Sequence, residues 1–263
     1  MKMKRALLVG LALILLAGSV ALAEEGVGAF AEFRGGVDAR AMGMGGAFVA
    51  IADSYSATYW NPAGVALAGG PRVGGMYTNK FMADINFNFL SGITNIAGLS
   101  VAGTYMGMST SAPASDGSII NWNSMMFSGT VAMNIAGIGF AGGTVKSYSA
   151  SAAGASASGF GFDAGLLVTM GGGISLGVAA FDIGDSKVNW SGTPTNPTDT
   201  VPAVFRLGAA YYMNGLTFAG EYDFGSPSVV ASTMRAGAEL DLDVVRIRGG
   251  VVMPQGGELG FTA

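Results

Sequence analysis

Alternate residues differ in character along several runs of about ten residues, and this feature constrains the fold most strongly. In the clearest run, residues 216–224, even positions hold Leu, Phe, Gly, Tyr and Phe, and odd positions hold Thr, Ala, Glu and Asp. Successive side chains of a β-strand point to opposite faces, so this run predicts a strand with one apolar and one charged face. Residues 160–169, 234–241 and 245–251 repeat the pattern, with their charges on one side.

The composition indicates what such strands build. Only 11% of the residues are charged, 50% are hydrophobic and 44 are glycine, whereas about 25% of a soluble globular domain is charged. A helical membrane span at Ala164 to Phe181 is disfavoured because Gly171 to Gly173 interrupt it. We therefore predict an all-β fold, an antiparallel transmembrane β-barrel, in which lipid-facing and lumen-facing residues alternate.

Turn residues divide the chain after Pro71 into eleven complete strands, with a twelfth beginning at Glu258. Short turns are predicted near residues 95–98, 136–137, 171–173, 214–215 and 242–243. Longer links are predicted near residues 108–118, 149–158, 185–201, 225–230 and 254–257. The barrel domain is thus assigned to residues 71–263. An exported barrel normally closes on its first strand, so we expect either a fragment of a longer barrel or closure by an unusual route.

Hairpin loops fix which residues face each other. A two-residue loop at residues 214–215 pairs Arg206 with Asp223 on the inner face, because paired residue numbers then sum to 429. A two-residue loop at 242–243 gives a sum of 485 and pairs Glu239 with Arg246. These charges are interpreted as cross-strand pairs that hold the barrel wall and its plug together, with a polar conduit as the alternative.

The amino terminus predicts export. Lys2, Lys4 and Arg5 precede an uncharged apolar run and a small-residue cleavage site, which together predict a signal peptide over residues 1–23. Its removal leaves ten Lys and Arg against seventeen Asp and Glu, so nucleic acid is excluded as a partner. The expected location is the bacterial outer membrane, with outer-membrane lipid as the surrounding solvent.

Two residue types are missing from the chain. It has no cysteine, so no disulfide framework stabilises it in an oxidising compartment. It has no histidine, so Ser-His catalysis and most zinc sites are excluded. We expect no enzymatic activity, no cofactor and no metal site.

Residues 24–70 lack the alternation and carry a different signature. A glycine cluster, Gly43-Met44-Gly45-Gly46, and Asp53 are followed by the box Tyr59-Trp60-Asn61-Pro62-Ala63-Gly64. A phosphate-binding loop at the glycines is disfavoured because no strand precedes them. The combined string resembles the amino-terminal region of the FadL-like outer-membrane proteins, particularly their PorV/PorQ branch, and weaker similarity covers most of the mature chain.

The resemblance implies a barrel of about fourteen strands whose amino-terminal segment fills the lumen as a hatch or plug. It implies hatch roles for Gly43, Gly45, Gly46, Asp53, Trp60, Asn61, Pro62, Ala63 and Gly64. It also implies that about two strands and a terminal aromatic signal are missing here. Independently, Asp53 or Ser54 is expected to cap a short helix that Pro62 ends, leaving Asn61 extended. A plain structural turn remains the alternative to a transport role for this box.

Three functions follow in order of preference. The first is a channel or transporter for hydrophobic small molecules such as long-chain fatty acids, gated by the hatch. The second, implied by the PorV branch, is a secretion-associated barrel that binds exported proteins, because a fold does not settle a function. The third is a general porin, which a plug disfavours.

Overall fold

The computed structural model describes residues 28–80, 84–114, 117–136, 138–225 and 231–263. The predicted signal peptide lies outside these residues. The described chain is all-β, with one 14-stranded antiparallel sheet and four short helical turns near its amino end. These turns are the 3₁₀ helix η1 (Ala31–Arg34) and the α-helices α2 (Ala39–Gly43), α3 (Ala57–Trp60) and α4 (Gly64–Ala68). None of the described helices has the length and apolar character needed to cross a bilayer.

Twelve strands follow one another in the main path of the sheet. They are β1 (Arg72–Lys80), β2 (Ile85–Ile96), β3 (Leu99–Pro113), β4 (Ile119–Ile135), β5 (Gly139–Ala152), β6 (Ala155–Met170), β7 (Ile174–Phe181), β10 (Val204–Met213), β11 (Leu216–Gly225), β12 (Thr233–Asp241), β13 (Arg246–Pro254) and β14 (Gly260–Thr262). Two further strands, β8 (Ser186–Ser191) and β9 (Thr198–Val201), form a hairpin that pairs with β6.

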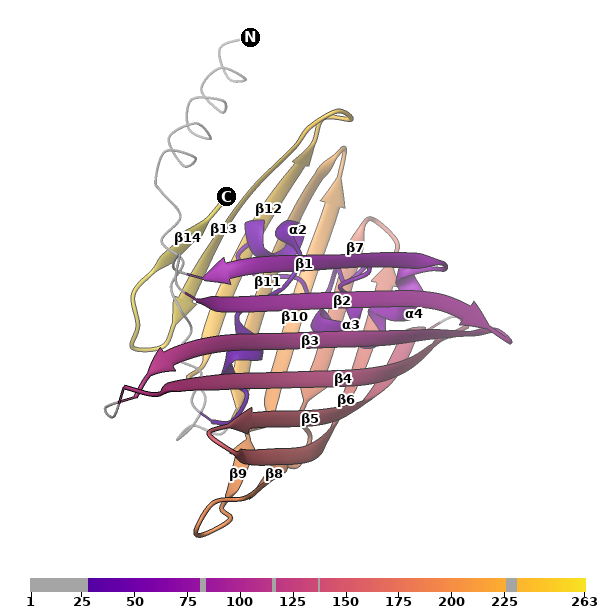
Figure 1. Ribbon diagram of the computed structural model, residues 1–263. Coiled ribbons are helices and arrows are strands. Elements are labelled where there is room, and N and C mark those ends of the chain that lie inside the picture. Colours follow the sequence, from indigo (N-terminus) through magenta and orange to yellow (C-terminus); the bar gives the residue numbers. More distant parts are fainter. Residues whose placement is uncertain (1–27, 81–83, 115–116, 137, 226–230) are drawn as a thin grey trace.

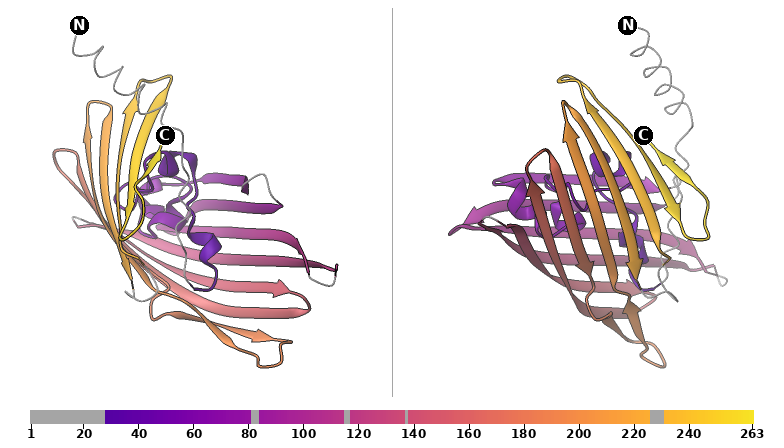
Figure 2. Two further views of the ribbon diagram at one scale, coloured as in Figure 1. Left: turned by 90° about the vertical axis from the view of Figure 1, so that its left-hand side faces the viewer. Right: turned by 180° about the vertical axis from the view of Figure 1, so that it is seen from behind.

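The sheet is strongly curved, and residues 28–70, called the N-terminal segment below, lie inside the curve (Figures 1 and 2). Strands β1 and β14 are the two edges of the main path, and no pairing between them is found in the described part of the chain (Figure 1). The observed architecture is therefore a curved sheet around a short helical segment, with barrel closure not detected.

The predicted alternation is confirmed where it is clearest. In β11, Glu221 and Asp223 are buried on the concave face, whereas Phe218 and Tyr222 are 47% and 39% exposed on the convex face. Soluble proteins usually bury apolar side chains and expose charged ones. Strand β6 shows the reverse, as β11 does, because Asp163 is buried and Phe160 and other apolar neighbours are exposed. Charge faces inward and apolar surface faces outward.

One of the two predicted registers is confirmed and the other is wrong. Strands β10 and β11 pair Arg206 with Asp223, as the two-residue loop requires. Strands β12 and β13 instead pair Glu239 with Arg248, because the link is four residues long, from Leu242 to Val245. The shift is two residues, so every side chain keeps its predicted face although its partner changes.

Three predicted links contain more strand than expected. Strand β3 extends into residues 108–118 as far as Pro113, and β5 and β6 extend through most of 149–158. The β5–β6 connection is only Ala153-Gly154, both with positive φ as a tight hairpin turn requires. The link at 185–201 contains the β8–β9 hairpin. Their Ser- and Ala-rich sequences resemble loops, but cross-strand pairing overrides that local preference.

Candidate functional site

The N-terminal segment is packed against the concave face through two apolar clusters. In one, Phe30, Phe33 and Val37 contact side chains of β2 to β6, including Phe87 and Met106. In the other, residues 41–68 bury an apolar core against inward-facing small and apolar residues of the sheet. The members of that core include Met44, Phe48, Ile51, Trp60 and Val65, together with Leu167, Ala210 and Ala219 from the sheet. The segment thus supplies most of the apolar core that the sheet encloses.

Glycines on the concave face let the backbone of the segment approach the strands. A Cβ atom added at any of six such glycines would overlap atoms of residues 44–63. These glycines are Gly142, Gly165, Gly177, Gly208, Gly237 and Gly250, on β5, β6, β7, β10, β12 and β13. Glycine in a strand interior often marks such a close approach of another backbone. We call these six residues the glycine seat.

Polar groups of the sheet bond to the segment backbone above this seat. The Glu221 carboxylate accepts hydrogen bonds from the backbone N–H groups of Phe48 (2.8 Å) and Val49 (2.7 Å). The Ser175 hydroxyl donates to the Ala50 carbonyl oxygen at 2.7 Å. Buried backbone groups need partners, so these side chains take the place of the secondary structure that the segment lacks here.

Asn61 joins three parts of the structure and is fully buried. Its side-chain amide donates to the carbonyl oxygens of Val49 (2.9 Å) and Leu166 in β6 (3.1 Å), and its Oδ1 accepts from the N–H of Ala63 (3.0 Å). Its backbone is extended, as predicted from the following Pro62. The side chain of Asn61 therefore ties the box both to the glycine-rich part of the segment and to the wall.

The remaining predicted hatch residues lie in the same packed region. Gly45 and Gly46 have positive φ, and their neighbours are strand backbone for Gly45 and the Trp60 ring for Gly46. Trp60 donates from its indole N–H to the Val37 carbonyl oxygen at 3.1 Å. Pro62 and Ala63 are buried over Gly142, Gly64 is packed against Ala52, and Gly43 lies beside Arg248. All nine residues are thus within the N-terminal segment or its contact with the sheet.

The predicted helix cap is wrong. Helix α3 begins after Ser56, which makes no side-chain capping bond. Ser54 donates instead to Asp38, and Asp53 forms an ion pair with Arg40. Asp53 and Ser54 do not occupy the N-cap position of α3, and their side chains are held by Arg40 and Asp38 instead.

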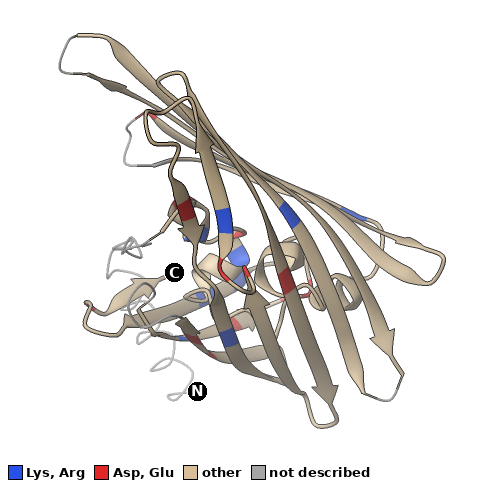
Figure 3. Ribbon diagram, turned by 90° about the horizontal axis from the view of Figure 1, so that it is seen from below, with Lys and Arg blue, Asp and Glu red and all other residues tan. Residues whose placement is uncertain are grey.

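Ion pairs connect the segment to the C-terminal strands. The Arg40 guanidinium bonds to Asp53 at 2.5 Å and to the carboxylate of Glu239 at 2.9–3.1 Å. Arg248 also donates to Glu239, at 2.6 Å. The predicted Glu239–Arg246 pair is therefore wrong, and Arg246 pairs with Asp241 at an exposed position. Charges are sparse elsewhere on the sheet (Figure 3).

We expect Arg40→Gln to lower the free energy of unfolding by about 1–2 kcal/mol. The variant leaves Asp53 without its partner and weakens the link to Glu239, but Arg40 is partly exposed, so solvent reduces the effect. Urea unfolding in detergent, followed by circular dichroism, measures the change. Arg246→Gln is the matched control and should unfold at the wild-type urea concentration, since that pair is exposed. Equal unfolding midpoints for the two variants would contradict a stabilising role for the ion pairs of Arg40.

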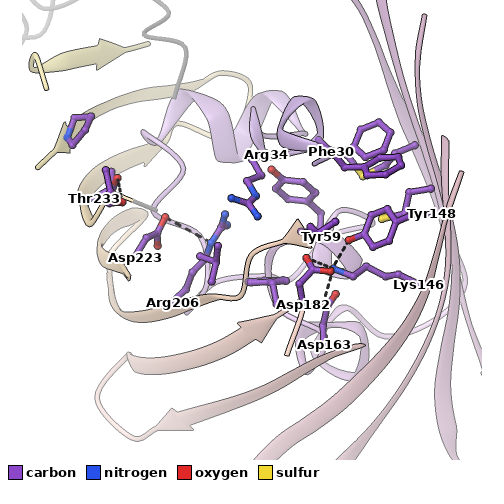
Figure 4. A pocket seen from close by; sticks show the side chains of 18 of the residues that line it. Phe30, Arg34, Tyr59, Lys146, Tyr148, Asp163, Asp182, Arg206, Asp223 and Thr233 are labelled. Atoms are coloured by element: carbon purple, nitrogen blue, oxygen red, sulfur yellow. Dashed lines mark hydrogen bonds and ion pairs between the residues drawn. The ribbon is translucent and has the colours of Figure 1, made fainter. Parts of the chain in front are cut away.

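A cavity of about 380 Å³ lies between the segment and the concave face (Figure 4). On one side it is bounded by a buried cluster in which Lys146 bonds to Asp163 (2.7 Å) and Asp182 (2.8 Å). Tyr148 donates to Asp182 at 2.7 Å. The pairing of Lys146 with Asp182 was not predicted, because Asp182 follows β7, which is not a neighbour of β5 in the sheet.

Arg34 and Arg206 also line this cavity. Arg206 is 7% exposed, and its guanidinium carbon lies 5.0 Å from the Phe181 ring centre and 5.3 Å from that of Trp60. Arg34 donates to the Pro202 carbonyl oxygen at 2.9 Å. Burial lowers the pKa of Arg34 below its usual value, and the nearby Asp182 charge opposes this shift. The cavity therefore combines two cationic groups with aromatic walls.

The described residues contain no group of three or more acidic, His or Cys side chains arranged to hold a metal ion. The fold and site define a class, an all-β protein whose antiparallel sheet curves around an N-terminal helical segment. When compared with known proteins, the chain matches no family model and no curated protein sequence.

Proposed function

We propose that this protein is an outer-membrane barrel protein that admits hydrophobic small molecules, with the N-terminal segment acting as its hatch. The observation that carries the proposal is the reversed arrangement of the sheet, with its apolar side chains outside and its charges inside. The FadL-like resemblance of residues 43–64 agrees with this function. The residues that carry this resemblance lie in the segment that contacts the glycine seat.

The membrane location is supported by the convex face. Apolar side chains on neighbouring strands are 38–66% exposed there, among them Phe205, Leu207, Phe218, Phe160 and Phe162. Soluble monomers rarely expose continuous apolar patches larger than a few hundred Å². Lipid is the solvent in which such a surface is stable, and outward apolar residues alternating with inward polar ones are typical of membrane strands.

Passage of a small molecule is supported by the division of the concave space. Residues 44–63 pack closely against the glycine seat and leave no space there. The cavity beside Phe30, Phe33 and Tyr148 is left unfilled. A molecule that crosses the wall would have to displace the segment or pass along this cavity. Residues 28–37 border the cavity and contact the wall mainly through side chains, and residues 43–46 of the same segment contact β13.

Locking the segment to the wall is expected to block uptake. The native chain has no cysteine, so a double variant, Gly43→Cys with Arg248→Cys, introduces a single pair. A Cβ at Gly43 would lie 3.4 Å from the Cβ of Arg248, close to the separation of about 3.5–4.5 Å found in disulfides. In reconstituted vesicles, oxidation should reduce entry of a labelled hydrophobic molecule about tenfold or more, and reduction should restore it.

The two single cysteine variants are the controls, and both should be insensitive to oxidant. Mass spectrometry establishes that the disulfide has formed. Unchanged uptake by the fully oxidised double variant would overturn the proposal that the N-terminal segment must separate from β13 for uptake. Failure of every form to admit the molecule, with the protein correctly folded, would overturn the transport function.

A further inference from the structure

Two guanidinium groups face the same cavity from opposite walls. Arg34 extends from the N-terminal segment and Arg206 from β10, and Figure 4 shows both side chains directed into the space between these elements. Like charges repel, and Arg206 is buried while Arg34 is partly buried, so this arrangement costs free energy. An anion between them would lower that cost.

Two of the three guanidinium nitrogens of Arg206 make no hydrogen bond. Its Nε and Nη1 atoms are buried and have no hydrogen-bond partner. The nearest carboxylate oxygens, on Asp223 and Glu221, lie 3.7 Å and 3.9 Å from Nε, which is too far for a hydrogen bond. An unpaired buried donor costs free energy, and more when it is charged, so such a group calls for an explanation.

The acidic groups around the cavity are mostly engaged with other cations. Asp163 and Asp182 are held by Lys146, and Asp223 bonds to Arg235 at 3.0 Å. Glu258 lies at the exposed rim. Among the described residues, no carboxylate lies within ion-pair distance of Arg34. Asp223 and Glu221 balance part of the Arg206 charge at ion-pair distance, so Arg34 and the unbonded donors of Arg206 are the groups left for a ligand.

The rest of the lining is apolar and largely aromatic. Phe30 packs against Tyr148 with ring centres 4.8 Å apart and against Phe33 at 5.7 Å, and Met106 and Met126 complete this wall. Aromatic walls favour offset or edge contacts with a ligand ring. A volume of about 380 Å³ is near the lower end of the range of about 300–1,000 Å³ for small-molecule pockets, which favours a compact ligand.

We propose that this cavity binds a compact organic acid, with its carboxylate between Arg34 and Arg206 and its aromatic or short apolar body against Phe30 and Phe33. The inference deepens the proposed function by naming a ligand class, and it departs from the long-chain fatty acids that the family resemblance implies. Binding at this site does not itself require transport.

The test uses the purified full chain in a neutral maltoside detergent, with equilibrium dialysis against protein-free micelles. The probes are 2-naphthoate, its neutral amide, palmitate and inorganic phosphate. Naphthoate should bind at least tenfold more tightly than the amide, palmitate or phosphate, because only naphthoate supplies both the charge and the compact ring. Equal affinity for the amide would overturn the carboxylate site, equal affinity for palmitate would overturn the compact ligand, and equal affinity for phosphate would reduce it to a simple anion site.

Arg34→Gln is the informative variant because Arg34 makes one hydrogen bond to the protein, so its loss should leave the fold intact. We expect naphthoate affinity to fall about tenfold and amide affinity to stay constant. Arg246→Gln, at an exposed pair far from the lining, should change neither. Wild-type naphthoate binding by Arg34→Gln would overturn the proposal. Tight naphthoate binding without vesicle uptake would remove the transport function and leave this site standing.

Discussion

Gly250→Val is expected to displace the N-terminal segment from the concave face. A Cβ at this position would overlap the Gly45 nitrogen and the Met44 carbonyl carbon, and backbone atoms have no rotamer by which to move aside. Overpacking of a filled interior costs about 1–3 kcal/mol, and here the segment can relieve it only by leaving. Trypsin cleavage after Arg34 and Arg40 should become about tenfold faster or more, because cleavage follows the population of the open form.

Gly129→Val is the matched control for this substitution. Gly129 lies in β4 of the same sheet, but nothing lies within 4 Å of a Cβ added there. Both variants place the same side chain in a strand interior, so strand propensity changes equally. Cleavage of the Gly129→Val protein should match the wild type. If Gly250→Val were equally protected, close seating of the segment on β13 would be disproved.

Glu221→Ala is expected to lower the free energy of unfolding by about 3–5 kcal/mol. The substitution removes the acceptor for the N–H groups of Phe48 and Val49 and leaves the buried Arg206 with one carboxylate fewer. Each buried group left unpaired carries its full desolvation cost. Urea unfolding in detergent gives the loss of stability, and tryptic cleavage gives the loosening of the segment.

Glu221→Gln separates the two contributions. Its amide oxygen can still accept from one or both backbone N–H groups, but the negative charge beside Arg206 is lost. We expect an intermediate loss of stability and a smaller increase in cleavage than for alanine. Glu258→Ala, at the exposed rim of the cavity, should leave both measurements unchanged. A wild-type unfolding midpoint for Glu221→Ala would show that this carboxylate does not hold the segment.

Local features of the sequence were enough to predict the strands and their faces. A period of two is set by backbone geometry alone, so the burial of Glu221 and Asp223 opposite the exposed Phe218 and Tyr222 follows from their positions in the run. The Asn214-Gly215 turn likewise determined the β10–β11 register, because both residues take the positive φ of a tight hairpin. The extended Asn61 before Pro62 is local in the same sense.

Exact turn lengths and contacts between segments distant in the chain could not be read in this way. The β12–β13 link was assigned two residues instead of four, and a change of two preserves every face, so the pattern holds no information that corrects it. Lys146 with Asp182, and Arg40 with Glu239, are pairs that only the curvature of the sheet brings together. The β8–β9 hairpin was hidden for the same reason, since its pairing with β6 compensates for a loop-like sequence.

The glycines show which features the sequence predicts and which depend on the tertiary structure. By itself, the sequence determined that a glycine-rich, weakly charged chain forms strands with a charged and an apolar face. The alternation assigns Gly250 to the charged face, but it gave no means of knowing that the backbone of Gly45 covers this glycine. Only the folded sheet decided this, because glycine is selected at Gly250 by what lies above it, and that neighbour is about two hundred residues away in the chain.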